Sequence, residues 1–269
     1  MVIDGKKIAS EILKGLKKQV RPEGFLAAFL VGNDSNSESF LKQKEKVAKE
    51  LGVDFRLYKF PEKITQDELR KEVLKVAEHK TCGGAIVQLP LPAHISEQYV
   101  SNAIPREKDV DVLGERALGA FYAGRNPVLP PAVGVVEEIL KVTSHKSQVA
   151  RVAVIGRGAL VGKPVAVWFM DKAAELSVFT SKTGDTKDKL KDADVIVSGV
   201  GKANLFGAED VKDGALVIDF GYDTKDGKFC GDFEAPAGET SIIYTPTPGG
   251  TGPILVAKLF ENFYRLTTL

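Results

Sequence analysis

The sequence is poor in cysteine, in histidine and in unbalanced charge. Its 269 residues include only two cysteines, Cys82 and Cys230, which lie far apart. We therefore expect no disulfide framework, and we expect the protein to be located in a reducing cytoplasm. The three histidines, His79, His94 and His145, are scattered, and we interpret them as surface residues with no metal site among them. Lys and Arg (37) nearly balance Asp and Glu (36), so the basic excess typical of nucleic-acid or membrane-surface binding is missing.

Long apolar runs are also missing. No stretch is long enough to span a bilayer. Residues 1–5 show neither the basic nor the apolar region of a signal peptide, which again favours a cytoplasmic protein. The apolar fraction of 43% is that of a globular protein, and the length suits one large domain or two ordinary ones.

What the first half of the chain does contain is an alternation of strands and helices. Apolar runs at 25–31 and 85–88 and an alternating segment at 55–60 predict strands, and amphipathic segments between them predict helices. One of these helices starts at a capping box formed by Thr65 and Glu68. This alternation predicts a mostly parallel sheet with covering helices, and hence an α/β fold.

A second alternating unit follows a segment rich in glycine and proline at 108–131. Strands are predicted at 151–155, 176–180, 195–200 and 215–220, with helices at 162–170 and 185–193. A last amphipathic helix follows the glycine-rich turn at 245–252 and is expected to return to the first domain. We therefore predict one domain over 1–130 plus 252–269 and a Rossmann-type domain over 131–251.

The start of the second unit carries a glycine motif. Gly156-x-Gly158-x-x-x-Gly162 lies between a predicted strand and a predicted helix, where a backbone can approach a pyrophosphate closely. The next strand ends in Thr180-Ser181-Lys182, without the acid that usually holds the ribose of NAD. Ser181, Lys182 and Arg157 are able to bind a 2′-phosphate, which favours NADP, although Lys182 alone is equally well interpreted as a solvated charge.

The string Ile86-Val87-Gln88-Leu89-Pro90-Leu91-Pro92 ends the third predicted strand. Proline lacks a backbone donor, so the strand stops near Gln88 and leaves an amide at the sheet edge where α/β proteins bind ligands. A proline-rich loop without function is the alternative.

Two further groups of residues are candidates for chemistry. Phe40 and Lys44 are four residues apart and share a helix face, which suits a flat ligand that needs proton transfer. The alternative is a solvated basic face with Phe40 in the core. Asp109 and Asp111 would share a face if their segment is extended, or else belong to a polar loop.

Taken together and in order, these pieces resemble the bifunctional methylenetetrahydrofolate dehydrogenase/methenyltetrahydrofolate cyclohydrolase family over essentially the whole chain. The matching strings are Ser37-x-x-Phe40-x-x-x-Lys44, Val87-Gln88-Leu89-Pro90-Leu91-Pro92, Lys108-Asp109-Val110-Asp111, Ile155-Gly156-Arg157 with Val161-Gly162-x-Pro164, Ser181-Lys182-Thr183, and Thr245-Pro246-x-Pro248-Gly249-Gly250-x-Gly252-Pro253.

The resemblance implies two α/β domains with a cleft between them and an enzyme of one-carbon metabolism. Such an enzyme oxidises methylenetetrahydrofolate with NADP⁺ and hydrolyses the methenyl product to 10-formyltetrahydrofolate, as a homodimer and without a metal. The implied catalytic residues are Lys44, Gln88 and Asp111, where Gln88 tunes Lys44 and Asp111 binds the pterin. The implied folate-binding residues are Phe40, Val87, Leu89, Pro248, Gly249, Gly250, Gly252 and Pro253. The implied NADP-binding residues are Gly156, Arg157, Gly158, Ser181 and Tyr222.

The sequence also departs from the family pattern. Phe40 replaces a tyrosine, and Val112 replaces a glycine in the Asp111-Val112-Leu113 string. Leu129-Pro130-Pro131 stands in place of Pro-Cys-Thr, and Gly158 in place of a serine. Two alternatives therefore stay open: a dehydrogenase with weak or absent cyclohydrolase activity, and a non-catalytic nucleotide- or folate-binding protein.

Overall fold

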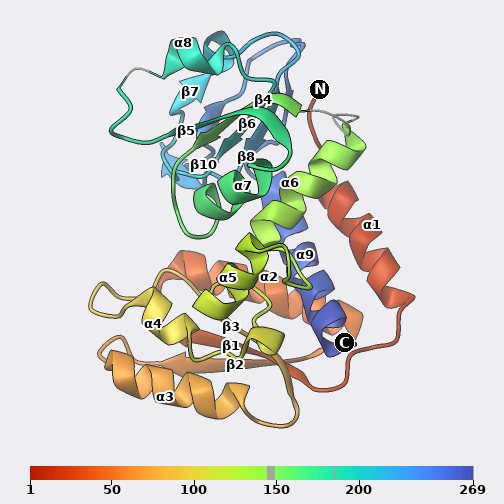
Figure 1. Cartoon of the computed structure of the whole chain (residues 1–269), viewed down its shortest axis with the longest axis vertical. Coiled ribbons are helices and arrows are strands. Elements are labelled where there is room, and N and C mark those ends of the chain that lie inside the picture. Colours follow the sequence, from red (N-terminus) through yellow and green to blue (C-terminus); the bar gives the residue numbers. More distant parts are fainter. Residues whose placement is uncertain (144–148, 185, 269) are drawn as a thin grey trace. The chain divides into compact units, whose positions relative to one another are not determined.

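The structure, a computed structural model, describes residues 1–143, 149–184 and 186–268. The chain forms two compact units. The three-stranded unit consists of residues 10–131 and 256–269, and the five-stranded unit consists of residues 1–9 and 132–255. The division falls within helices α1 (Gly5–Lys17) and α9 (Thr251–Thr267), and at the start of α6 (Pro131–Val142). Figure 1 labels the elements.

These units differ from the predicted division at residues 1–9, at Pro131 and at residues 252–255. The N-terminal ammonium of Met1 donates to Ile242 O at 2.7 Å, and Ile3 N donates to Tyr244 O at 2.8 Å. A Cβ on Gly5 would lie 1.7 Å from Gly250 O, so these two backbones are in close contact. The first residues thus pair with the last strand of the second sheet, which a segment this short does not reveal in its sequence pattern.

The three-stranded unit contains one parallel sheet, in the order β2-β1-β3. Its strands are β1 (Phe25–Val31), β2 (Asp54–Phe60) and β3 (Cys82–Val87). Its helices are α2 (Ser35–Leu51), α3 (Gln66–Ala77), α4 (Glu97–Ser101), η1 (Arg106–Lys108) and α5 (Glu115–Tyr122). Helices α2 and α3 lie on opposite faces of the sheet (Figure 1).

Strand β1 is the centre of the core in this unit. All seven of its residues are buried, because both faces of a central parallel strand are covered. Phe25, Ala27, Phe29 and Val31 pack in one hydrophobic cluster with apolar residues of α3. The predicted capping box of α3 is present: Thr65 and Glu68 cap each other's backbone N–H groups.

The chain crosses from β2 back over β1 to reach β3. Helix α2 therefore begins just after the carboxyl end of β1, and Gln88 lies just after the carboxyl end of the neighbouring β3. Gln88 N donates to Phe29 O at 2.9 Å, which carries the pairing one residue beyond β3. This edge is where open α/β sheets bind ligands.

The five-stranded unit contains a second parallel sheet, in the order β12-β8-β6-β4-β5. Its strands are β4 (Val149–Ile155), β5 (Ala173–Phe179), β6 (Val195–Ser198), β8 (Leu216–Asp219) and β12 (Ile243–Tyr244). Two small additions are a parallel pair, β7 (Phe206–Gly207) with β11 (Phe233–Glu234), and a hairpin, β9 (Asp223–Lys225) with β10 (Lys228–Cys230). Its short helices are α7 (Gly162–Phe169), α8 (Lys187–Leu190) and η2 (Ala208–Asp210).

Some predicted elements of this unit are longer than the observed ones. Strand β6 ends at Ser198. Gly199 N still donates to Ile155 O of β4, but Val200 N and Lys202 N turn to bond the Asp232 carboxylate. Helix α8 spans only Lys187–Leu190, and residue 185, where we expected it to begin, lies outside the described residues.

Three other expectations concern the histidines, the cysteines and membrane-spanning helices. His79 and His94 are exposed, and His145 lies outside the described residues. Both cysteines are free thiols. Within the described part of the chain, no helix combines the length and the apolar character that crossing a membrane requires.

Candidate active site

The centre of the candidate site is a hydrogen bond between Lys44 and Gln88. Lys44 Nζ donates to Gln88 Oε1 at 3.0 Å, although the two residues lie 44 positions apart in the chain. Helix α2 supplies the lysine and the end of β3 supplies the amide. The predicted pairing of these two residues is therefore present in the structure.

Gln88 is held from both sides. Its backbone N–H bonds Phe29 O, and its side-chain Nε2 donates to Leu89 O at 2.8 Å. The Leu89–Pro90 peptide bond is cis. Only 9% of Gln88 is exposed. Because the Nε2 group is used by Leu89, the side-chain oxygen must face Lys44, so the amide acts there as an acceptor.

Asp111 adds a carboxylate charge that interacts with Lys44. Burial lowers the pKa of the Lys44 ammonium, and the nearby Asp111 carboxylate works against that change. Burial likewise raises the pKa of Asp111, opposed by Lys44. The two pKa values therefore move toward each other, so a proton is exchanged at this site at a lower cost than between two solvated groups.

Asp109 has a different task from Asp111. The segment is a turn rather than an extended strand, with only Asp109 bridging to Ala85 of β3. Asp109 Oδ2 accepts from Leu113 N at 3.0 Å and from Gly114 N at 2.8 Å. Burial raises its pKa to about 7, with a smaller contribution from the Asp111 charge. Asp109 thus stabilises the loop that carries Asp111 through these hydrogen bonds.

The other predicted folate residues of this unit surround the Lys44–Gln88 pair. Phe40 is half-buried one turn before Lys44 on α2. Leu89 is half-buried, and its carbonyl oxygen anchors Gln88. Val87 is buried, and it packs in the core cluster that contains Phe29; its role in folate binding stays a prediction.

Ser37 is a residue of this site that we did not predict as functional. It is almost fully buried, and its hydroxyl donates to Leu89 O at 3.5 Å. Its backbone N–H is capped by Asp34 at 2.7 Å. The spacing of Ser37 from Phe40 and Lys44, which places the three on neighbouring turns of one helix, was the available signal.

In the five-stranded unit, the glycine motif forms a tight turn between β4 and α7. Gly156 has φ +100°, and its N–H bonds Phe179 O of the next strand. A Cβ on Gly162 would lie 2.2 Å from Gly156 O, so glycine is required at both ends of the turn. A Cβ on Gly158 would meet open space.

The strand order locates this turn at a switch point. The chain leaves β4 toward β5 on one side and later returns to place β6 on the other. In doubly wound sheets the crevice at such a point binds a dinucleotide, with its pyrophosphate at the helix N-terminus. The geometry of the turn therefore fits the predicted cofactor.

The turn after β5 contains the side chains that would contact the ribose of the cofactor. Thr180 N donates to Thr183 Oγ1 at 2.8 Å, and Lys182 N donates to Thr180 Oγ1 at 3.2 Å. These bonds make a compact turn that leaves Ser181 and Lys182 exposed. Arg157 is exposed after β4. A hydroxyl and two cations, with no carboxylate in this turn, suit a phosphate better than a free ribose hydroxyl.

Two buried aspartates shape the loops around this crevice, and we did not predict them. Asp232 accepts from Ser198 Oγ at 2.5 Å, Val200 N at 2.7 Å and Lys202 N at 2.8 Å. Asp219 accepts from Gly221 N and Phe233 N, and burial raises its pKa to about 7. An aspartate that directly ends an apolar strand was the signal for Asp219.

The remaining predicted residues lie near these aspartates. Tyr222 follows Gly221, is partly exposed and stacks on Phe229 with ring centroids 4.8 Å apart. The turn before α9 is tied to the same place, since Thr251 Oγ1 donates to Asp219 O at 2.9 Å. The turn contains Pro248, Gly249 with φ +101°, and Gly250. Gly252 and Pro253 form the first turn of α9.

Comparison of the sequence with known proteins identifies its family. Residues 3–111 match the tetrahydrofolate dehydrogenase/cyclohydrolase catalytic domain, and residues 130–268 match the tetrahydrofolate dehydrogenase/cyclohydrolase NAD(P)-binding domain. The bifunctional protein FolD of Listeria innocua is 37% identical over 97% of this chain and 95% of its own length.

Solved structures agree as well. The bifunctional methylenetetrahydrofolate dehydrogenase/cyclohydrolase FolD of Campylobacter jejuni has a TM-score of 0.91 at 31% identity, covering 100% of this chain and 98% of its own. The Trypanosoma brucei enzyme, solved with NADP cofactor and an inhibitor, has a TM-score of 0.90 at 30% identity, covering 100% and 97%. The chain therefore belongs to the tetrahydrofolate dehydrogenase/cyclohydrolase family.

Proposed function

We propose that this protein is a bifunctional enzyme of one-carbon metabolism. It oxidises 5,10-methylenetetrahydrofolate to the methenyl cation with NADP⁺ and hydrolyses that cation to 10-formyltetrahydrofolate. The observation that carries the proposal is the Lys44–Gln88 hydrogen bond beside Asp111, in a chain that matches both domains of the family. A protein that only binds its ligand has no need of a lysine whose pKa is lowered.

The first step asks little of the protein beyond orientation. Bound NADP⁺ supplies the acceptor for the hydride that leaves the methylene carbon. The carbon already carries two nitrogens that stabilise the resulting cation, so the protein contributes mainly by holding the substrate in place. We assign this task to the Phe40 ring as a stacking surface, and to Asp111 as an acceptor for the donor edge of the pterin.

The second step uses Lys44 to move protons. The neutral amine accepts a proton from water as the water oxygen adds to the methenyl carbon. The resulting ammonium returns that proton to N5 as the bond from the carbon to N5 breaks. The remaining hydroxyl proton leaves to solvent as the formyl carbonyl forms. Gln88 keeps Nζ in place throughout, because its own amide is fixed by Leu89 O.

The cofactor is assigned to the five-stranded unit. Gly156, Arg157, Gly158 and Ser181 would hold the phosphates of NADP, and Tyr222 would contact the cofactor through its backbone. The turn at 248–253 would let backbone approach the folate and the nicotinamide, with glycine freedom at Gly249. The folate domain over 1–130 plus 252–269 and the NADP domain over 131–251 stay predictions, from which the structural units differ as described above.

A second candidate function follows from one residue. Phe40 lacks the hydroxyl that the family tyrosine would place one turn from Lys44. Without it, the protein would be a dehydrogenase with weak or absent cyclohydrolase activity. The homodimeric state and the cytoplasmic location stay predictions; light scattering of the purified protein tests the first.

The deciding experiment follows both steps in one cuvette. Methylenetetrahydrofolate is mixed with NADP⁺ or NAD⁺, and the methenyl absorbance is recorded as it rises and then decays. We expect faster reduction with NADP⁺ and a methenyl decay faster than in buffer. Decay at the buffer rate would select the dehydrogenase without cyclohydrolase activity. No reduction with either cofactor would leave only a binding protein.

A variant pair tests the role of the lysine. Lys44→Met should abolish enzymatic methenyl hydrolysis, because no neutral amine remains to accept the water proton. Lys46→Met, an exposed lysine on the same helix, is the matched control and should keep the wild-type rate. Equal rates in the two variants would remove Lys44 from its assigned role.

A further inference from the structure

The loop that carries Asp111 is held in a conformation that its sequence disfavours. Val112, the next residue, has φ +56° and is fully buried. A β-branched side chain is uncommon in this left-handed region, because its Cβ approaches the following carbonyl oxygen. This chain has valine where the family pattern has a glycine, and the valine adopts the left-handed conformation. Contacts elsewhere must therefore stabilise the turn.

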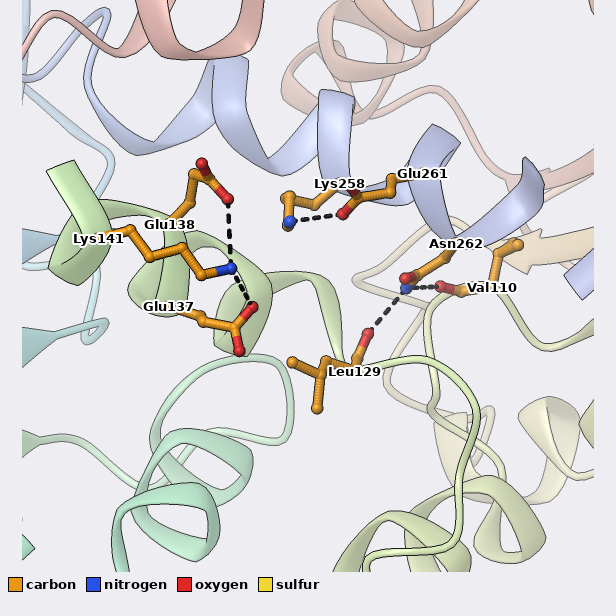
Figure 2. A network of polar contacts seen from close by, with 8 residues as sticks. All are labelled: Val110, Leu129, Glu137, Glu138, Lys141, Lys258, Glu261 and Asn262. Atoms are coloured by element: carbon orange, nitrogen blue, oxygen red, sulfur yellow. Dashed lines mark hydrogen bonds and ion pairs between the residues drawn. The ribbon is translucent and has the colours of Figure 1, made fainter. Parts of the chain in front are cut away.

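One of these contacts comes from helix α9. Asn262 Nδ2 donates one hydrogen bond to Val110 O at 2.9 Å and another to Leu129 O at 2.8 Å, as Figure 2 shows. Asn262 is buried, with 7% exposed, so its amide makes these bonds within the protein and not with bulk water. The Val110 carbonyl and the Asp111 N–H belong to one planar peptide group. By holding that carbonyl, Asn262 fixes the peptide plane from which Asp111 starts.

The second contact acts on the other side of Asp111. The Asp109 carboxylate accepts from Leu113 N and Gly114 N, and only 1% of Asp109 is exposed. Asp109 is itself fixed to the sheet by its bridge to Ala85 of β3. The turn is therefore held by Asn262 just before Asp111 and by Asp109 just after Val112.

We propose that Asn262 and Asp109 are positioning residues, which together hold the strained turn so that the Asp111 carboxylate can bind the pterin edge of tetrahydrofolate. This inference rests on the proposed function, in which Asp111 binds that edge. Neither residue needs to touch the substrate. Their contribution is to prevent the turn from relaxing to a negative φ at Val112, which would rotate Asp111 away from Lys44 and from the ligand.

The test uses the full-length enzyme and separates folate binding from cofactor binding. Asn262→Ala removes the amide nitrogen that donates to Val110 O in the turn and to Leu129 O. We expect its KM for methylenetetrahydrofolate to rise at least tenfold, while its KM for NADP⁺ changes less than twofold. Thr267→Val is the matched control, since it also removes a side-chain donor shared by two backbone carbonyls, Phe263 O and Tyr264 O, and lies on the same helix as Asn262. This control should leave both KM values unchanged.

Asp109→Leu carries the test if Asn262→Ala does not fold. It keeps roughly the size of the side chain but removes the oxygen that accepts from Leu113 N and Gly114 N, so the same selective rise in the KM for folate is expected. The positioning role would be overturned if the wild type is active and the folded variants keep the wild-type KM for folate. It would also be overturned if their KM values for folate and for NADP⁺ rise equally. A wild type that reduces neither cofactor would overturn the proposed function, and this inference with it.

Discussion

Replacing Gln88 by glutamate would change the charge beside the candidate catalytic lysine with almost no change in shape. The wild-type amide oxygen accepts from Lys44 Nζ at 3.0 Å, and the amide nitrogen donates to Leu89 O at 2.8 Å. The variant would place a carboxylate at the same position. It would favour the ammonium form of Lys44 and so raise the lysine pKa that burial lowers.

The size of this effect follows from the distance. With the carboxylate charge shared by two oxygens about 4 Å from Nζ, and an effective dielectric constant of about 20, the attraction is roughly 4 kcal/mol. About 1.4 kcal/mol corresponds to one pKa unit, so the upper limit is a rise of about three units. Burial of the new carboxylate and its repulsion from the Leu89 carbonyl reduce this gain. We therefore expect a rise of about one to two units.

The assay is the pH dependence of methenyl hydrolysis. Because the mechanism needs the neutral amine, the rate increases with pH through the lysine pKa. The rising limb of the Gln88→Glu profile should move to higher pH by the same one to two units. A second measurement without catalysis is the pH dependence of Lys44 modification by an amine-selective reagent, which should shift in the same direction.

The control is Gln88→Met, which removes the hydrogen bond without adding a charge. It should reduce the rate but should not move the limb to higher pH. If Gln88→Glu folds and binds folate with a limb at the wild-type pH, then the lysine is not coupled to position 88, and the proton-transfer role argued for Lys44 is refuted.

Three further predictions concern other parts of the chain. Phe40→Tyr should accelerate methenyl hydrolysis by about tenfold, the effect of one added hydrogen bond of roughly 1.4 kcal/mol, with little change in the folate KM; an unchanged decay of methenyl absorbance would show that the hydroxyl has no role. Arg157→Ala should raise the KM for NADP⁺ by roughly 30-fold, about 2 kcal/mol for a charge-assisted bond, and barely affect NAD⁺; equal losses for both cofactors would count against a 2′-phosphate contact. Asp219, with a pKa raised to about 7 in the folded protein, binds its proton more tightly there than in the unfolded chain, where it titrates near 4. The free energy of unfolding should therefore fall as pH rises from about 4 to 7, by at most roughly 4 kcal/mol for this group, and urea titrations of Asp219→Asn should show a flatter dependence; an equal or steeper one would contradict the shift.

Much of the secondary structure was predictable because it rests on local patterns. The buried strand at 25–31 needs no more than a continuous apolar run, and the helix after Thr65 carries its own capping box. The same holds for the turn at Gly156, since only glycine fits its backbone conformation. Where loops compete with strands, as after Ser198, the sequence pattern extends too far, because the competing partner Asp232 lies 34 residues further along.

The candidate site also has features that the sequence predicts and features that only the fold creates. The residue types at Lys44 and Gln88 are visible in the sequence, but their contact arises only because β3 lies next to β1 in the sheet. Residue type alone did not separate Asp109 from Asp111, since both fit a polar loop, although the family resemblance pointed to Asp111. Burial decides between them, and burial is a property of the folded unit.

By itself, the sequence determined the α/β class, the family and the identity of the groups that can carry out proton transfer and bind phosphate. These properties depend on residue type and on short-range spacing. Only the tertiary structure decided which of these groups meet, how far their pKa values move, and that Val112 holds a left-handed turn with help from Asn262 about 150 residues away. Such features depend on desolvation and on long-range hydrogen bonds, which exist only once the chain has folded.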